Sequence, residues 1–236
     1  MAQPRDPRRA MILARRHVAG ASFLLGAVIL ILAVPRLVAD VLMLPGDRVL
    51  DALQHRHDVT PAELRTLAAS REAALPWTPS GHVRVDLATA ELLLAANEVG
   101  GGPRYHDLID RAQTELRGGL ARAPADPYGW TRLAYAGLAA NEPARKIIPD
   151  LAMAIETAPV EATLVFSRLQ LSLLEWPYFS NEHPSLFEQQ VRVAWDQSNE
   201  RLVHLAIAID RKEAVRNALN PGDRAEFDRQ VADENQ

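Results

Sequence analysis

One uninterrupted apolar run near the N-terminus constrains the fold more than any other feature of the chain. Residues 18–34 carry no charge and no strongly polar side chain. A helix of that length is about 26 Å long, close to the ~30 Å hydrocarbon core of a bilayer. The apolar pattern resumes beyond Arg36 and ends at Pro45 and Gly46, where a missing amide and a flexible residue favour a turn. We therefore predict a transmembrane helix over residues 18–44.

The charges that precede this run predict its orientation. Residues 1–17 contain five arginines and a single acidic residue, Asp6. Positively charged flanks stay on the cytoplasmic side of a membrane, so we expect residues 1–17 to form a cytoplasmic basic segment. The part of the chain that follows the span would then be translocated.

A cleaved signal peptide is the competing interpretation, because it also combines a basic segment with an apolar one. Its cleavage site needs two small residues that stand two positions apart. Ala33 would pair with Ile31 and Ala39 with Leu37, and neither partner is small. The pattern favours an anchor that the mature protein retains.

The length of the chain, 236 residues, suits this anchor, a linker over residues 45–59 and one domain over residues 60–236. Because the whole chain carries a net charge of −4 and residues 1–17 carry +4, the remainder carries −8. An acidic domain argues against binding to nucleic acid. Cysteine is absent, so an exported domain would fold without disulfide bonds.

The segment after the span has helical periodicity, and the alternation typical of strands is scarce. Thr60 and Glu63 form a capping-box pattern with Pro61 at the first helical position, which predicts a helix from there to about residue 74. Further helices are expected over residues 86–99, 105–123 and 144–157 (broken early by Pro149), from a second capping box at Ser185, and from Asp223. We predict an all-α fold: one N-terminal transmembrane helix followed by an antiparallel helical array.

Two segments in the middle of the chain repeat a pattern of residue types. Residues 130–138 and 166–174 align at an offset of 36, each with an aromatic residue, a small hydroxyl residue, arginine and leucine in order. Recurrence at such a period is typical of stacked helical hairpins. We expect Trp130 and Phe166 to fill the interior between paired helices, as large aromatic residues at equivalent repeat positions do.

The arginines of this repeat, Arg132 and Arg168, have two interpretations. One is that they bind an anionic partner, and the other is that they pair with acidic residues close to them. We favour the local pairs, because exposed ion pairs are common and individually weak.

The repeat resembles the start of the tetratricopeptide pattern, in Trp130 and Leu133 and in the proline-bearing turn at Pro159. It departs from that family where Ala134 replaces the usual glycine and Gly137 the usual tyrosine, and its spacing is 36 instead of about 34. The resemblance implies a tetratricopeptide-like (TPR-like) helical domain with a concave face. In the family's geometry the residues that face this groove are Thr131, Tyr135, Ser167 and Leu171.

The layout as a whole resembles a group of small bacterial inner-membrane proteins that have one N-terminal span and a TPR-like domain. Residues 122–130 and 190–195 carry this resemblance. It implies a single-pass protein of the bacterial inner membrane with a cytoplasmic N-terminus and a periplasmic domain. It further implies a part in the synthesis or export of envelope polysaccharide.

No group of residues in the sequence predicts catalysis, a cofactor or a metal. His55, His57 and Asp58 do not have the spacing of a known ligand set and are better explained as a solvated linker. Motifs of the type HExxH, paired cysteine or GxSxG are missing. The alternative is an extracytoplasmic enzyme acting on polysaccharide or peptidoglycan, which would need a carboxylate pair or an activated nucleophile in a cleft.

A cluster of aromatic residues adds a second candidate surface. Trp176, Tyr178 and Phe179 follow an apolar helix, and they either fold back onto the core or form an exposed contact patch. Without a catalytic motif, we predict a membrane-anchored scaffold or accessory subunit that binds other membrane or periplasmic proteins. The predicted partner-binding residues are Thr131, Tyr135, Ser167, Leu171, Trp176, Tyr178 and Phe179.

The anchor interpretation is tested by topology and by mass. A reporter that is active only outside the cytoplasm should be active when it is fused after Gln236. The intact mass of the protein should begin at Met1 or Ala2. A mass that begins near Asp40 or Asp47 would reveal cleavage and remove the anchor.

Overall fold

In this computed structural model the chain is described over residues 7–98 and 100–234, with side chains from Ser22 onward, and these residues form helices and no strand. The helices are α1 (Pro7–Gln54), α2 (Pro61–Ala74), α3 (Gly81–Ala96), α4 (Pro103–Leu120), α5 (Pro127–Ala139), α6 (Ala144–Thr157), α7 (Val165–Leu174), α8 (Tyr178–Glu182), α9 (Pro184–Gln197), α10 (Asn199–Ala208), α11 (Lys212–Ala218) and α12 (Arg224–Glu234). The predicted all-α class is confirmed.

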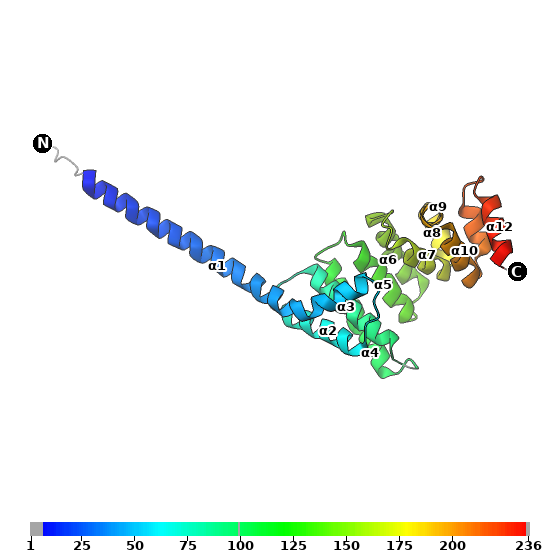
Figure 1. Ribbon diagram of the computed structural model, residues 1–236, viewed down its shortest axis with the longest axis horizontal. Helices are drawn as coiled ribbons and strands as arrows, with labels where there is room; N and C mark the ends of the chain where they lie inside the picture. The colour runs from blue at the N-terminus through cyan, green and yellow to red at the C-terminus, as the bar shows by residue number, and fades with distance from the viewer. Residues whose placement is uncertain (1–6, 99, 235–236) are drawn as a thin grey trace.

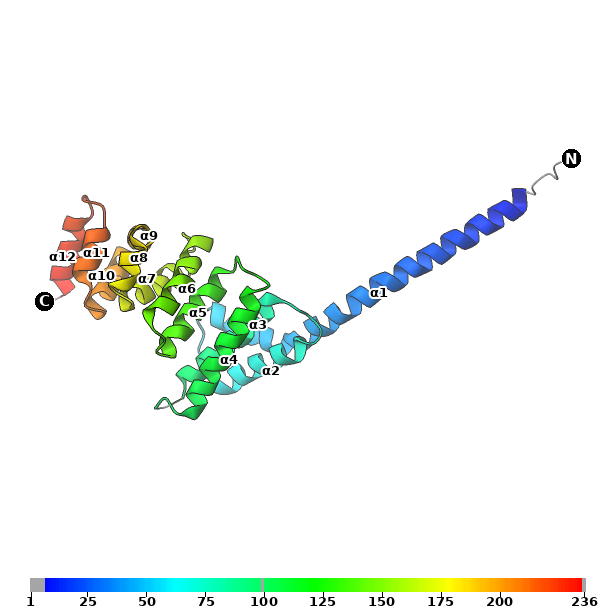
Figure 2. The same ribbon diagram turned by 180° about the vertical axis from the view of Figure 1, so that it is seen from behind.

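The helices after α1 stack one upon the next along the chain. Neighbours in sequence pack together from α1 to α7, and α9 then packs against α7, α10 and α11. Figure 1 shows the result as an elongated body, with α1 projecting from one end and the C-terminus at the other. Figure 2 shows the same order from behind. This is an array of helices, and its TPR-like character stays a prediction.

Two hydrophobic cores lie along the array and meet at α5. Leu133 belongs to the N-terminal core, which α2 to α5 build, whereas the next residue, Ala134, belongs to the C-terminal core around α6, α7 and α9. Phe166 is buried in the C-terminal core. Trp130 is partly buried against the N-terminal core, and its indole N–H donates to the Pro124 carbonyl at 2.8 Å. Both repeat aromatics therefore fill interior space, as expected.

The first helix is longer than the sequence predicted. Instead of ending at Pro45 and Gly46, α1 continues to Gln54, so residues 45–54 are not a linker. A proline inside a helix removes one backbone hydrogen bond and crowds the preceding turn. Tertiary packing offsets this cost, because the turns beyond Pro45 bury Val49 against α2 and α3.

Gly46 serves close packing and does not end the helix. It is buried where α1 crosses α2, and a Cβ at this position would overlap the hydroxyl of Ser70. The same Cβ would lie 3.1 Å from a methyl group of Leu67. Only glycine lets the two backbones approach this closely.

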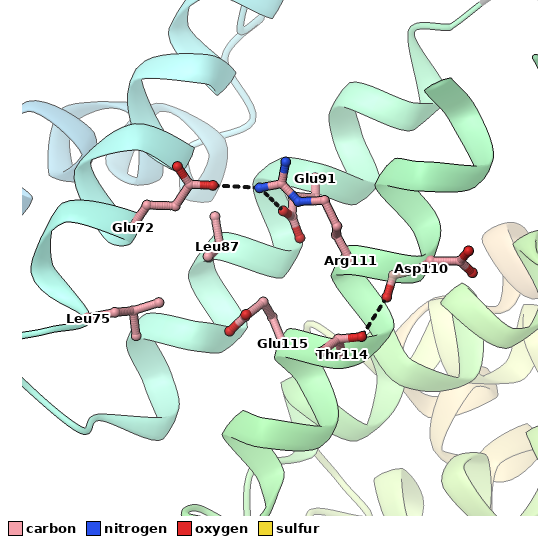
Figure 3. Close-up of a pocket in the computed structure, with 8 residues that line it drawn as sticks. All are labelled: Glu72, Leu75, Leu87, Glu91, Asp110, Arg111, Thr114 and Glu115. Carbon is pink, nitrogen blue, oxygen red and sulfur yellow. Dashed lines mark hydrogen bonds and ion pairs between the residues drawn. The ribbon is translucent and has the colours of Figure 1, made fainter. Parts of the chain in front are cut away.

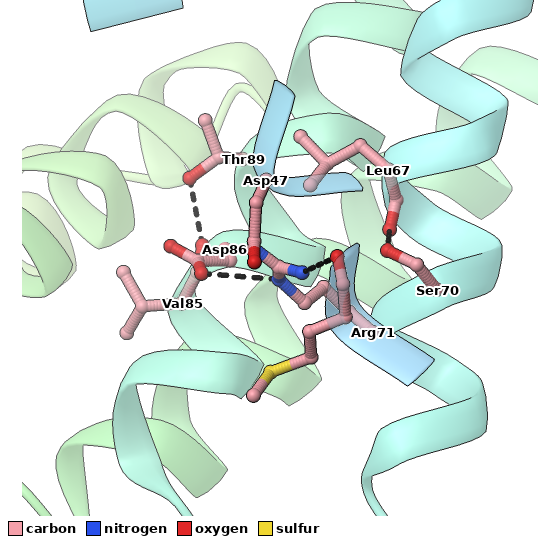
Figure 4. Close-up of polar contacts among 8 residues, drawn as sticks. Asp47, Leu67, Ser70, Arg71, Val85, Asp86 and Thr89 are labelled. Carbon is pink, nitrogen blue, oxygen red and sulfur yellow. Dashed lines mark hydrogen bonds and ion pairs between the residues drawn. The ribbon is translucent and has the colours of Figure 1, made fainter. Parts of the chain in front are cut away.

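A buried arginine joins α1 to the body of the protein (Figure 4). The side chain of Arg71 in α2 is 2% exposed. Its Nη2 donates to Asp47 Oδ1 at 2.7 Å and its Nη1 to the Met43 carbonyl at 3.0 Å, both in α1. Its Nε donates to Asp86 Oδ2 in α3 at 3.2 Å. One guanidinium thus ties three helices together.

Other local predictions have mixed outcomes. The capping box is confirmed, since the Thr60 amide donates to Glu63 Oε2 at 2.8 Å and the Glu63 amide to Thr60 Oγ1 at 3.3 Å. The second box at Ser185 is wrong, because α9 begins one residue earlier and no side chain caps it. Pro149 does not break α6, whose buried residues on either side of the proline hold the helix in the core.

One helix in the described part of the chain is long and apolar enough to cross a membrane, and it is α1 from Ser22 onward. Its large apolar side chains between Phe23 and Leu32 are exposed, Phe23 by 77% and Leu32 by 72%. No residue that the structure describes covers them. This exposure distinguishes the segment from the core helix of a soluble protein.

The arginine contact predicts a large loss of stability when it is removed. Arg71→Met leaves Asp47 and Asp86 without their hydrogen-bonded cation, and should lower the free energy of unfolding by about 3 kcal/mol. Arg65→Met, on the exposed face of the same helix, is the matched control and should change it by less than about 0.5 kcal/mol. Chemical denaturation of the protein in mild detergent measures both. Equal midpoints for the two variants would contradict the assigned role of Arg71.

Candidate binding groove between α5 and α7

The repeated segments meet along one groove. It has a volume of about 320 Å³ and lies between α5 and α7. All four residues predicted to face the concave surface line it: Thr131, Tyr135, Ser167 and Leu171. The other lining residues are Tyr128, Arg132, Leu138, Leu164, Gln170 and Leu174. The groove residues are brought together because the two helices pack side by side and repeat the same spacing.

The two hydroxyl residues of the groove use their hydroxyls within their own helices. Thr131 Oγ1 donates to the Pro127 carbonyl at 2.7 Å, and Ser167 Oγ donates to the Leu164 carbonyl at 2.9 Å. They shape the wall and offer few hydrogen bonds to a ligand. Direct polar recognition must therefore come from other residues.

The floor and rim of the groove are apolar. Leu171 is buried at the floor, whereas Leu174 is 46% exposed and Tyr135 is 45% exposed. Tyr128 is held in place at one end, because its hydroxyl lies 2.8 Å from Thr163 Oγ1 and donates to Glu161 Oε1 at 3.2 Å. An exposed tyrosine beside an apolar hollow is typical of protein contact surfaces.

Arg132 is the charged residue of this groove. Its guanidinium carbon lies 5.8 Å from the centre of the Tyr128 ring, and its nitrogens make no hydrogen bond or ion pair with any residue that the structure describes. Burial lowers the pKa of Arg132, and the nearby carboxylates of Asp86 and Asp126 oppose this effect. Both carboxylates have other partners: Asp86 binds Arg71, and Asp126 Oδ1 accepts from two amides at the start of α5.

The second repeat arginine has a different role. Arg168 is completely buried and, contrary to expectation, binds backbone carbonyls instead of a neighbouring acid. Its Nη1 donates to the backbone carbonyls of Ala154 at 2.7 Å and Ala158 at 2.8 Å. Its Nη2 donates to the backbone carbonyl of Glu161 at 3.4 Å. Burial lowers its pKa to about 10. Arg168 thus closes the C-terminal end of α6, and only Arg132 of the pair is left for a partner.

The aromatic cluster at 176–179 divides between core and surface. Phe179 is fully buried in the C-terminal core. Trp176 is half-buried, with its ring centre 5.2 Å from that of Phe187. Tyr178 is 59% exposed. Of the three predicted contact residues here, Tyr178 is the one with an exposed side chain, and the burial of Phe179 makes its predicted role in partner contact wrong.

A second hollow, of about 350 Å³, contains a buried carboxyl group that the sequence did not reveal (Figure 3). Glu91 in α3 is buried, and Arg111 Nη2 in α4 lies 2.8 Å from its Oε1 and 2.5 Å from Glu72 Oε1. Burial raises the pKa of Glu91 to about 7, and this rise is opposed by Arg111 and increased by Glu115 and Glu72. In sequence Glu91 is one of two acids on α3, beside Asp86, and only tertiary packing shows that it is buried.

A carboxyl group that titrates near neutral pH suits general acid–base chemistry. The lining of this hollow supplies further carboxylates, Glu72, Asp110 and Glu115, but its one hydroxyl, on Thr114, donates to the Asp110 carbonyl at 2.9 Å. Among the described residues no cluster of three metal-binding side chains occurs. This hollow is therefore one place where an enzymatic alternative could be tested.

Comparison with known proteins adds no relative on which to base a function. No protein family, no curated protein and no solved structure matches this chain. The functional argument consequently rests on the geometry and chemistry of these two hollows.

The raised pKa of Glu91 predicts how stability depends on pH. The folded protein holds this proton more tightly than the unfolded chain, where the pKa is near 4.5. Stability from this group is therefore complete below about pH 4.5 and is lost as the pH rises through about 7. The loss is at most about 3 kcal/mol, since each pKa unit corresponds to about 1.4 kcal/mol.

Glu91→Gln isolates this contribution. Between pH 4.5 and 8 the variant should lose less stability than the unmodified protein, and at pH 8 it should be the more stable of the two. Glu182→Gln, which changes an exposed acid outside this hollow, should keep the original pH dependence. Thermal melts across this pH range provide the measurement. Parallel curves for the unmodified protein and Glu91→Gln would show that Glu91 is charged throughout.

Proposed function

We propose that this protein is a membrane-anchored helical scaffold or accessory subunit that binds a segment of a partner protein in the groove between α5 and α7. The observation that carries the proposal is the combination of an apolar floor, exposed Tyr135 and Leu174, and the unpaired Arg132 in one hollow. Tyrosine and arginine beside well-packed leucines are the residue types that contribute most to protein interfaces.

The chemistry of the groove also suggests which segment it binds. Arg132 supplies one positive charge inside a domain whose net charge is negative. A carboxylate entering the groove would form a charge-assisted hydrogen bond with its guanidinium. Apolar side chains next to that carboxylate would cover Leu171 and Leu174. The partner segment we propose is therefore an apolar peptide that carries one aspartate, glutamate or C-terminal carboxylate.

The anchor gives this contact a location. A span over residues 18–44 with a basic N-terminal flank would place the groove on the far side of the membrane, in the periplasm of a bacterium. Tethering to one membrane raises the effective concentration of any partner that shares it. A moderate affinity of the groove for the partner segment would then suffice for stable binding. We propose other membrane or periplasmic proteins as the partners.

A second candidate function rests on Glu91. Its pKa of about 7 beside Arg111 and three further acids is the kind of environment in which a carboxyl group acts as a general acid or base. An envelope enzyme acting on polysaccharide or peptidoglycan is the corresponding alternative. Under that alternative, Glu91→Gln abolishes function and leaves both folding and partner binding intact.

The groove proposal is tested by cross-linking from within the hollow. A photoreactive phenylalanine analogue at Tyr135 should attach one defined partner in intact membranes. Arg132→Gln should reduce this adduct at least tenfold, because a charge-assisted hydrogen bond is worth about 1.5–3 kcal/mol. Arg145→Gln, on an exposed arginine of α6, is the matched control and should leave the yield unchanged.

The outcomes separate the two functions. Loss of the adduct together with loss of the cellular phenotype supports the scaffold. An adduct of equal yield in Arg132→Gln and Arg145→Gln would contradict the role of the groove. A phenotype that depends on Glu91 and not on Arg132 would favour the enzyme instead.

A further inference from the structure

The part of α1 around Ala39 and the connection between α2 and α3 lie at the same level along the α1 axis. Ala39 in α1 is buried against Ala74, the last residue of α2, and Val83, near the start of α3. Leu42 and Leu75 pack against the same small cluster. Figures 1 and 2 both show this connection at the end of the body where α1 enters it. The segment 76–80 therefore faces the membrane side of the molecule.

On the opposite face of α1 an apolar stripe continues past this level. Leu37 is 63% exposed, Val41 56% and Leu44 58%. Their spacing places them on one face of the helix, away from the packed residues. Residues 18–44 would be about 40 Å long as a helix, which exceeds the ~30 Å hydrocarbon core. The last turns of this stripe therefore reach into the interfacial layer, where the charged side chains of Arg36 and Asp40 are also tolerated.

Trp77 occupies the connection at that level. It is 46% exposed, and its indole N–H makes no hydrogen bond to any described residue. Proline residues flank it on both sides at positions 76 and 79, which stiffens the segment. Tryptophan is enriched at the boundary between lipid and water, because its ring is apolar and its N–H remains hydrated there.

From this placement we infer that the α2–α3 connection is a membrane-contacting element, in which Trp77 inserts into the lipid headgroup layer beside the end of the α1 span. The occupant of this surface is the bilayer itself, since the surface continues the face of the proposed span. The contact gives the body a second point of attachment. Together with the Arg71 contacts, it fixes the tilt of the body and hence the height of the groove above the membrane.

The inference rests on the proposed membrane anchor, and the test distinguishes the two. The chain has no cysteine, so a single introduced cysteine gives one labelling site in the full-length protein. Three variants carry an environment-sensitive dye: Pro79→Cys in the connection, Ile29→Cys in the middle of the span, and Asn220→Cys in the exposed loop before α12. Each protein is reconstituted into vesicles of phosphatidylcholine and phosphatidylglycerol that contain a nitroxide lipid.

We expect the nitroxide lipid to quench the dye at residues 29 and 79 at least threefold more than at residue 220, with blue-shifted emission at both. Quenching at residue 29 together with equal, weak quenching at residues 79 and 220 would overturn the inference and leave the anchor standing. No quenching at residue 29 would remove the anchor and the inference with it. If a second copy of the chain covered this surface instead, the dye at residue 79 would be shielded from aqueous iodide but would not be quenched by the nitroxide lipid. That result would also overturn the inference.

The part assigned to Trp77 has its own test in the same system. Trp77→Ser in the Pro79→Cys background should reduce lipid quenching at residue 79 at least twofold, because the anchoring ring is lost. Unchanged quenching would overturn the assignment to Trp77. Melting curves confirm that each variant is folded, and Thr78→Cys replaces Pro79→Cys if the latter is unstable.

Discussion

The three-way contact of Arg71 is the interaction on which the rest of the structure depends. A guanidinium that is 2% exposed binds an acid and a carbonyl of α1 and an acid of α3. Leaving such a group unpaired would be costly, so α1 has to continue past Pro45 and dock along α2. The proposed span and the helical body thereby become one continuous unit, and the α5–α7 groove is held in a defined direction from α1.

Much of this architecture is predictable from local sequence patterns. Thr60 and Glu63 identify the start of α2 because both halves of a capping box lie within four residues. The four groove residues could be named because the tetratricopeptide resemblance implies a concave face at these positions, and the structure places all four around one hollow. The apolar run near the N-terminus is equally local, since a span is defined by its own length and composition.

The remaining features depend on contacts between distant segments. Gly46 has the sequence pattern of a helix end, and only the approach of Ser70 shows why a helix retains it. Arg168 and Arg132 occupy equivalent repeat positions, yet Arg168 is buried among carbonyls, whereas Arg132 lies over the Tyr128 ring and makes no ion pair with a described residue. Burial of Glu91 and Phe179 likewise follows from tertiary packing. The charge of a residue predicts the kind of interaction it makes, and its partner is decided by the fold.

Hydrogen exchange of the backbone amides of residues 47–54 tests the central claim most directly. If the proposed span and the body are one continuous unit, these amides exchange as slowly as those of α2, because their helix is buried against it. The amides of Asp58 and Val59, outside any helix and without a hydrogen bond to a described residue, should exchange fast and provide an internal standard. Exchange of residues 47–54 at the rate of these two amides would contradict the account, because the body would then hang from a flexible linker.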